Sequence, residues 1–268
     1  MTADSIESFR NFIDGAWEDQ TDKMPAINPA TGKQIAWLPR SDRVCAAARS
    51  RPPGARVVAL AKRIAASRHL RFGGLQAYHG RAQHQRTLEE RSASIAAAAQ
   101  KARGLVDDLK RAGLDCAIVG GAGTGTFALE AASGVFTELQ VGSYIFMDAD
   151  YGRNDPPPPF GNSLFVLSTA VSAPRAGSVL VDAGHKAVAV DSGLPLVWNR
   201  KGVTYVEAAD EHGALSLSQD AEPIRLGERV MLVPGHCDPT VDRYDWYVGI
   251  RRSRVESLWP VAARGAMA

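Results

Sequence analysis

The stretch His236-Cys237-Asp238 holds the residue types and spacing of this chain that best suit metal chemistry. It follows an apolar run, residues 230–233, and the turn pair Pro234-Gly235. On an extended backbone, side chains i and i+2 share a face, so the imidazole of His236 and the carboxylate of Asp238 would point the same way, with Cys237 facing a buried side. One nitrogen and one oxygen ligand form half of a divalent-metal site. The alternative is a hydrogen-bonded surface pair.

A glycine-rich turn is the second candidate. Residues 120–126, Gly-Gly-Ala-Gly-Thr-Gly-Thr, follow a strand-like run at 116–119 and precede a helical pattern at 127–133. Free N–H groups and threonine hydroxyls in such a turn can hold a phosphate against a helix N-terminus. The alternative is an ordinary flexible turn, since glycine-rich turns are common.

The elements that must position these residues divide most of the chain into two halves. Helical patterns at 57–67 and 87–113 alternate with strand-like runs at 70–78 and 116–119, which predicts a parallel βα arrangement. Thr87 and Glu90 form a capping box at the start of the longer helix. Beyond the proline run 156–159, short apolar runs predict an all-β half. Its expected strands are 164–167, 178–182, 187–190, 202–206 and 230–233.

Composition and charge exclude several classes of function. The chain has 268 residues, 45% hydrophobic and 22% charged, with a formal net charge of +2 and no basic stripe, so nucleic acid is not an expected partner. No apolar run approaches the ~20 residues that cross a bilayer, and the N-terminus lacks an apolar signal segment. Three scattered cysteines argue against a disulfide framework. We expect no membrane partner and a cytoplasmic location.

Five strings carry a family resemblance: LRFGGLQAYHGRAQH, GGAGTGTFALEAASGVFTELQVGSYIFMDADY, FVLSTAVS, VDAGHKAVAVDSGLP and VPGHCDPTVDRYDWYVGIR. In this order, over about residues 51–259, they resemble the D-threonine aldolases and the related D-serine and 3-hydroxyaspartate dehydratases, which are pyridoxal phosphate (PLP) enzymes of the alanine-racemase type. The implied fold is α/β plus all-β, a partial (truncated) TIM-like PLP-binding barrel followed by a C-terminal β-domain.

The first part of the chain resembles a different family. NFIDGAW and NPATGKQIA, within residues 9–45, are similar to the N-terminal arm of aldehyde dehydrogenases. A strand with a turn at Asn11–Trp17, a turn at Ile27–Lys33 and a strand at 34–38 are expected there. We therefore divide the chain into an arm at 1–48, a partial barrel at 49–158 and a β-domain at 159–268.

The resemblance also implies roles for individual residues. His84 matches the histidine that abstracts the proton of the substrate β-hydroxyl, and Tyr78 would contact the cofactor. Without the resemblance, a surface histidine and a half-buried tyrosine are the alternatives. The phosphate contacts would be Thr124, Gly125 and Thr126, with Gly142, Ser143 and Tyr144 as the second half of the site. His236 and Asp238 would bind Mn²⁺, Mg²⁺, Co²⁺ or Zn²⁺.

The family's Schiff-base lysine has no counterpart in this sequence, because no segment resembles the one that carries it. The seven lysines are Lys23, Lys33, Lys62, Lys101, Lys110, Lys186 and Lys201. We interpret the chain as an aldolase, cleaving D-3-hydroxy amino acids to glycine and an aldehyde, that is impaired by this loss. The alternatives are a D-serine or 3-hydroxyaspartate dehydratase and a non-catalytic metal-binding remnant. A monomer or homodimer is expected.

Overall fold

The computed structural model describes residues 54–262 and 264–265 and, before them, only the backbone of short strands. These strands are β1 (Glu7–Ser8), β2 (Asn11–Ile13), β3 (Ala16–Glu18), β4 (Lys23–Ile27) and β5 (Gln34–Pro39). β2 pairs antiparallel with β3, and β5 lies between β1 and β4. The strands expected at 11–17 and 34–38 are confirmed. The turn expected at 27–33 lies, beyond residue 27, outside the described residues.

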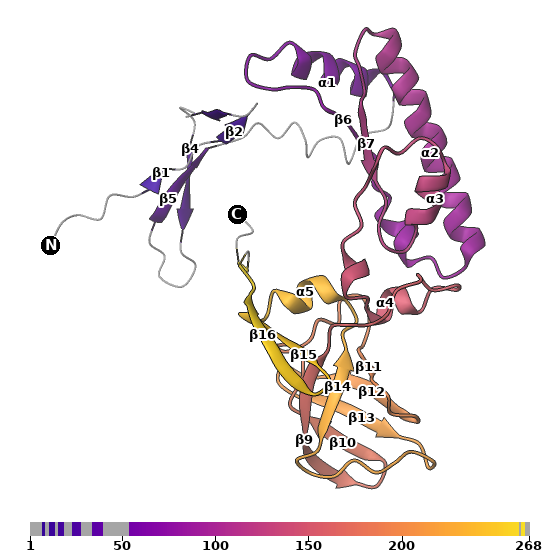
Figure 1. Ribbon diagram of the computed structural model, residues 1–268, viewed down its shortest axis with the longest axis vertical. Coiled ribbons are helices and arrows are strands. Elements are labelled where there is room, and N and C mark those ends of the chain that lie inside the picture. The colour runs from indigo at the N-terminus through magenta and orange to yellow at the C-terminus, as the bar shows by residue number, and fades with distance from the viewer. Residues whose placement is uncertain are drawn as a thin grey trace, which may run out of the picture.

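Parallel strands alternate with helices in the next part of the chain, as the sequence predicts. The elements are α1 (Ala55–Ala65), β6 (Gly74–Gln76), the 3₁₀ helix η2 (Gly80–His84), α2 (Leu88–Arg111), β7 (Ile118–Gly121), α3 (Phe127–Ala132) and β8 (Glu138–Leu139). β7 pairs in parallel with both β6 and β8. The long helix α2 packs against α1 and α3 (Figure 1).

The capping box predicted for α2 is confirmed. The Thr87 hydroxyl accepts from the Glu90 N–H at 3.2 Å, and the Glu90 carboxylate accepts from the Thr87 N–H at 3.2 Å. These bonds satisfy donors that the first turn of a helix leaves unpaired. The buried positions of the helix include Ile95, Ala99 and Ala102, which share one face at helical spacing.

Antiparallel strands form the second half, which confirms the predicted change from alternating strands and helices to an all-β half. One sheet has the order β11-β14-β9-β10-β13-β12, and β15 and β16 form a separate hairpin. The bounds are β9 (Val166–Arg175), β10 (Ser178–Val181), β11 (Leu196–Val197), β12 (Val203–Ala208), β13 (Gly213–Leu217), β14 (Arg229–Val233), β15 (Trp246–Arg251) and β16 (Arg254–Pro260). Val181, Leu215 and Leu232 are fully buried in its core.

The strand expected at 187–190 is wrong. Val188 and Ala189 are fully buried, but the segment is a turn. The Val188 N–H donates to Gly184 O at 3.0 Å, and the Ala189 N–H donates to the Thr240 hydroxyl at 3.0 Å. A short apolar run indicates that a segment is buried, but not that it is a strand. Here the backbone N–H groups bond to a nearby carbonyl and to a side chain, so no neighbouring strand is needed.

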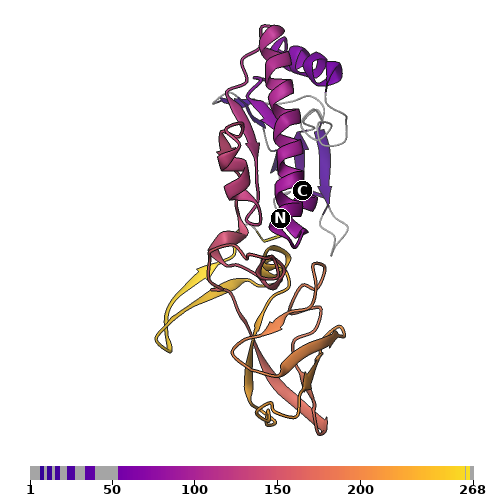
Figure 2. The ribbon, with the colours of Figure 1, turned by 90° about the vertical axis from the view of Figure 1, so that its right-hand side faces the viewer.

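The junction between the two halves consists of short helices. η3 (Ser143–Ile145) and α4 (Ala149–Gly152) follow β8, and α5 (Cys237–Val241) follows β14. Figure 2 shows the helical part and the antiparallel sheet arranged one after the other along the long axis, with this junction between them. Among the described residues, no helix is long and apolar enough to cross a bilayer.

Candidate active site

Helix α4 joins the two halves of the chain. Its N-cap, Asp148, is buried, and three N–H bonds connect it and the following residues with residues 234–237. These bonds run from Ala149 to Pro234 O (2.9 Å), from Asp150 to Gly235 O (3.2 Å) and from Cys237 to the Asp148 carboxylate (3.2 Å). Burial raises the pKa of Asp148. The N–H groups of Tyr151 and Cys237 and the nearby His236 lower it, but burial has the larger effect. These bonds join the start of α4 to the start of α5, and Figure 1 shows the two helices near each other between the two halves.

His84, the predicted base, lies at the end of η2 and contacts α4. Its Nδ1 is 2.5 Å from Asp150 Oδ2, and its ring centroid is 6.3 Å from that of Tyr151. Arg86 approaches the other oxygen of the same carboxylate at 2.5 Å. The carboxylate of Asp150 is 4% exposed, whereas the His84 side chain is 49% exposed. The imidazole is thus held on one side and open to solvent or substrate on the other.

Tyr78 lies in the same neighbourhood. It follows β6 and is 40% exposed, which agrees with the half-buried alternative. Burial raises the pKa of Tyr151, and Tyr78 and Asp148 act in the same direction. A Cβ at Gly80, the first residue of η2, would lie 3.4 Å from Tyr78 Cε1, so the tyrosine ring lies beside the start of that helix.

The glycine-rich turn is held by a residue that the sequence analysis did not select. Gln83 is fully buried, its Oε1 accepts from the Gly125 N–H at 3.0 Å, and its Nε2 donates to the Thr126 hydroxyl at 2.7 Å. A Cβ at Gly123 would approach Gln83 Oε1 to 2.6 Å, so glycine permits this contact. Two of the predicted phosphate contacts are therefore engaged within the protein.

Thr124 is the exception in this turn. Its side chain is 1% exposed, and its hydroxyl has no hydrogen-bond partner among the described residues. A buried polar atom without a partner is a group that a ligand or an ordered water satisfies. The turn thus retains a donor that fits a phosphate, and Thr124 is the residue that supplies it.

The second half of the predicted phosphate site, Gly142 to Tyr144, is linked to the helix that follows this turn by two successive ring contacts. The Tyr144 ring is 5.6 Å from that of Phe160, which is 5.6 Å from that of Phe127 at the start of α3. Gly142 is exposed, and Ser143 is near enough to the Cys237 thiol to act on its pKa. Burial raises the pKa of that thiol to about 11, although Ser143 opposes the shift.

The extended backbone expected through Asp238 is wrong. His236 is extended, with φ −140° and ψ 126°, but it is the N-cap of α5, and Asp238 lies in the first helical turn. Pro239 is compatible with that turn because the first helical N–H groups need no intrahelical partner. The Thr240 hydroxyl closes the turn by donating to His236 O at 2.7 Å. The prediction of a small buried Cys237 is confirmed, since it is 2% exposed.

The contacts of His236 fit a metal ligand. Its Nδ1 is 3.2 Å from Asp191 Oδ2, and a metal-binding histidine characteristically donates its second ring nitrogen to a carboxylate in this way. The imidazole is half-buried with Nδ1 in these contacts, so a metal would bind at Nε2, and Asp238 is exposed beside it in sequence. No group of three or more His, Cys, Asp or Glu suited to a metal exists among the described residues. Water or substrate would have to complete the coordination.

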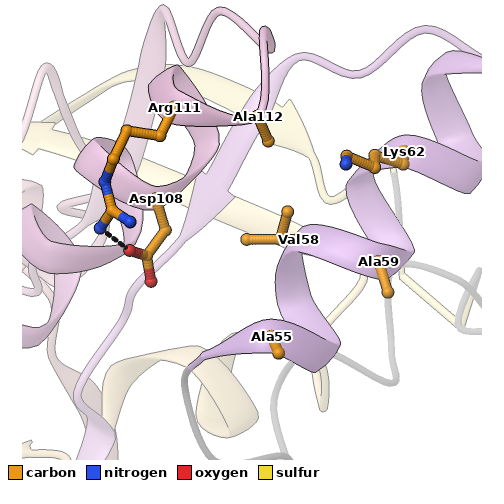
Figure 3. Close-up of a pocket in the computed structure, with 7 residues that line it drawn as sticks. All are labelled: Ala55, Val58, Ala59, Lys62, Asp108, Arg111 and Ala112. Carbon is orange, nitrogen blue, oxygen red and sulfur yellow. Dashed lines mark hydrogen bonds and ion pairs between the residues drawn. The ribbon is translucent and has the colours of Figure 1, made fainter.

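The lysines of the described residues lie away from this site. Lys62 is on α1, Lys101 and Lys110 are on α2, and Lys186 and Lys201 are in turns of the β half. Lys62 lines a cavity between α1 and α2 that holds none of the predicted site residues (Figure 3). Lys33 and the side chain of Lys23 lie outside the described residues. The missing Schiff-base lysine stays a prediction.

Replacing Glu130 with glutamine is expected to stabilise the protein at neutral pH by about 1 kcal/mol, a rise of about 2–4 °C in Tm. Glu130 is 1% exposed, accepts from the Thr126 hydroxyl at 2.8 Å, and has a second oxygen without a partner. Burial raises its pKa above the ordinary 4.5. The folded state therefore retains the Glu130 proton to a higher pH than the unfolded state does. The stability that comes from burying the neutral acid is lost as pH rises through the folded pKa.

Thermal melts of parent and Glu130→Gln at pH 7.5 and at pH 4.5 measure the effect. The gap between the two proteins should be present at pH 7.5 and smaller at pH 4.5. Equal Tm values at both pH values would mean that the carboxylate carries no burial penalty.

Comparison with known proteins identifies relatives of this chain. Residues 163–250 match the family model described as "Putative serine dehydratase domain". A 3-hydroxy-D-aspartate aldolase of Paracoccus denitrificans is 44% identical over 217 residues, which cover 78% of this chain and 55% of the relative. The crystal structure of the D-threonine aldolase from Filomicrobium marinum is 45% identical with a TM-score of 0.77, over 81% of this chain and 59% of that one.

A more distant structure bears on the fold alone. An alanine racemase-like protein from Idiomarina loihiensis superimposes with a TM-score of 0.59 at 20% identity, over 72% of this chain and 56% of that one. The chain therefore has an alanine-racemase-like fold with a C-terminal β-domain, and it spans a little over half the length of the curated relative. It is a homologue of the 3-hydroxy-D-aspartate and D-threonine aldolases, and the resemblance predicted from its sequence is confirmed.

Proposed function

We propose that this protein is a lyase that uses PLP and a divalent metal ion to cleave D-3-hydroxy amino acids into glycine and an aldehyde, with an activity impaired by the predicted loss of the Schiff-base lysine. The observation that carries the proposal is the arrangement around α4. The open imidazole of His84 contacts Asp150 and Tyr151 of this helix. The turn with the unpaired buried hydroxyl of Thr124 packs on the helix at Gly125, where an added Cβ would lie 3.1 Å from the Tyr151 ring, and Gly235, next to the ligand-like His236, accepts the Asp150 N–H. The identity with two aldolases supports the same reaction class.

Each group in this arrangement has a part in the proposed reaction. His84 accepts the proton of the substrate β-hydroxyl, and Thr124 binds the cofactor phosphate. His236 and Asp238 hold the metal ion, which stabilises negative charge on the β-oxygen when bound. PLP, when bound, supplies the electron sink for the carbon left after Cα–Cβ cleavage.

Finer assignments belong to the same proposal. The cofactor contacts are Tyr78, Thr124, Gly125, Thr126, Gly142, Ser143 and Tyr144. Gly125 and Thr126 act by shaping the turn, because Gln83 already engages their polar groups. The metal is Mn²⁺, Mg²⁺, Co²⁺ or Zn²⁺, the protein is cytoplasmic, and it is a monomer or homodimer. The chain divides at residues 48 and 158.

A dehydratase is the second candidate, because residues 163–250 match a serine dehydratase domain. The two reactions leave different products. Retro-aldol cleavage of D-threonine yields glycine and acetaldehyde, whereas dehydration yields a 2-oxo acid and ammonia. Product analysis therefore separates them without ambiguity.

The test is an assay of the full chain with PLP, Mn²⁺ and D-threonine. We expect equal amounts of glycine and acetaldehyde, and a loss of about 10²–10⁴-fold in rate for His84→Ala. His212→Ala, a change at an exposed histidine of the β half, is the control and should keep the parent rate. A 2-oxo acid as product would establish the dehydratase. No turnover at all would leave the non-catalytic metal-binding remnant as the remaining interpretation of the chain.

Borohydride reduction in the presence of PLP tests the lysine prediction separately. A pyridoxyl-lysine peptide mapped to any of the seven lysines would contradict the predicted loss. Its absence, together with no turnover, would mean that this chain does not bind the cofactor covalently.

A further inference from the structure

The two ring nitrogens of His84 have different surroundings. Nδ1 lies 2.5 Å from Asp150 Oδ2, and Asp150 is 3% exposed. An ionised carboxylate only accepts hydrogen bonds, so the imidazole must donate from Nδ1. A neutral imidazole carries one ring proton, and a proton on Nδ1 leaves Nε2 as the acceptor. The half-exposed side chain presents that nitrogen outside the Asp150 contact.

Asp150 is itself held from several directions. Arg86 Nη2 approaches Oδ1 at 2.5 Å, and Arg86 Nη1 donates to Asp150 O and to Asn154 Oδ1, both at 2.8 Å. The Asp150 N–H donates to Gly235 O at 3.2 Å. An always-charged guanidinium in contact with a buried carboxylate favours the ionised form and fixes its orientation. The carboxylate therefore has one oxygen for Arg86 and one for His84.

We propose that Asp150, oriented by Arg86, is a positioning residue that keeps the ring proton of His84 on Nδ1 and so makes Nε2 the base. The proton placement stands on this geometry alone, while the identity of the proton that Nε2 accepts rests on the proposed function. In that step the substrate O–H bond breaks, an N–H bond forms at Nε2, and the resulting imidazolium is stabilised by the Asp150 carboxylate.

The substitution Asp150→Asn is expected to exchange the donor and acceptor roles of the two ring nitrogens of His84. Arg86 has donors only, so the amide oxygen of the new side chain must face Arg86. The amide NH₂ then faces His84 Nδ1, which has to accept, and the ring proton moves to Nε2. The size and shape of the side chain are unchanged, but the nitrogen that faced the substrate no longer accepts a proton.

Nitrogen NMR of the full chain with ¹⁵N-labelled histidine reads the tautomer directly, at pH about 8.5 where imidazoles are ordinarily neutral. His79 provides an internal reference, because its Nδ1 accepts from the Ala82 N–H at 3.2 Å and its proton must be on Nε2. We expect His84 as the Nδ1–H tautomer in the parent and the Nε2–H tautomer in Asp150→Asn. His79 should be Nε2–H in both.

Two results would overturn the inference. One is an Nε2–H tautomer of His84 in the parent, which needs no folded variant to observe. The other is an unchanged Nδ1–H tautomer in a folded Asp150→Asn protein with an unaltered His79 signal. Either result would show that Asp150 does not place the proton.

Kinetics connect the inference to the reaction. If the parent cleaves D-threonine, Asp150→Asn should lower kcat by about 10²-fold or more with little change in KM, because a base in the wrong tautomer cannot accept the proton. A tautomer switch in a protein without turnover supports this inference and defeats the proposed function. Full activity in a variant with the inverted tautomer would defeat the role assigned to Asp150.

Discussion

Gly235→Ala is expected to destabilise the protein by about 3 kcal/mol or more, which lowers Tm by about 6–12 °C. A Cβ at this position would lie 1.8 Å from Gly193 O and 3.3 Å from Ala189 O. Both neighbours are backbone atoms, so no side-chain rotation relieves the overlap, and a main-chain segment has to move. Gly235 also accepts the Asp150 N–H, so the displacement reaches α4 directly.

The matched control is Gly161→Ala. Gly161 is exposed, its φ lies outside the left-handed region, and no heavy atom lies within 4 Å of the added Cβ. Its Tm should stay within about 2 °C of the parent, as surface substitutions ordinarily do. A melt of Gly235→Ala within the same margin would mean that the Gly235 backbone is not in close contact with residues 189–193.

The elements that could be predicted from the sequence are those with local causes. The capping box at Thr87 and Glu90 marks the start of α2 correctly because its two hydrogen bonds join residues three apart. The antiparallel strands of the second half follow from short β-branched runs between turn residues. Helix α5 was missed because five residues are too few for a periodic pattern, and residues 187–190 were misread because burial alone does not select a strand.

The polar groups that build the site could not be predicted, because each acts across a large sequence separation. Asp150 contacts His84 from 66 residues away, Asp191 contacts His236 from 45, and Gln83 contacts Gly125 from 42. Nothing local distinguishes these residues from solvent-exposed ones. For Asp150 and Gln83 the signal is burial with hydrogen bonding, and for the exposed Asp191 it is the contact with His236; both exist only once the chain is folded.

His236→Ala is expected to weaken Mn²⁺ binding by more than about 100-fold, because it removes the imidazole ligand itself. Asp191→Asn keeps the size and an acceptor oxygen of the side chain that orients His236 but removes its negative charge, so a smaller loss of about 10–100-fold is expected. Calorimetric titration of the full chain with MnCl₂ measures both constants. His185→Ala, at an exposed histidine of the same half, is the control and should bind as the parent does.

The relative effects of the two carboxylates decide which of them is a ligand. If Asp238 binds the metal, Asp238→Ala should lose more affinity than Asp191→Asn, because a lost ligand costs more than a lost orienting hydrogen bond. The reverse order would make Asp191 the ligand, 3.2 Å from His236 Nδ1, and Asp238 an acidic residue that interacts favourably with the N-terminus of α5. Equal binding by parent, His236→Ala and both carboxylate variants would place the metal elsewhere.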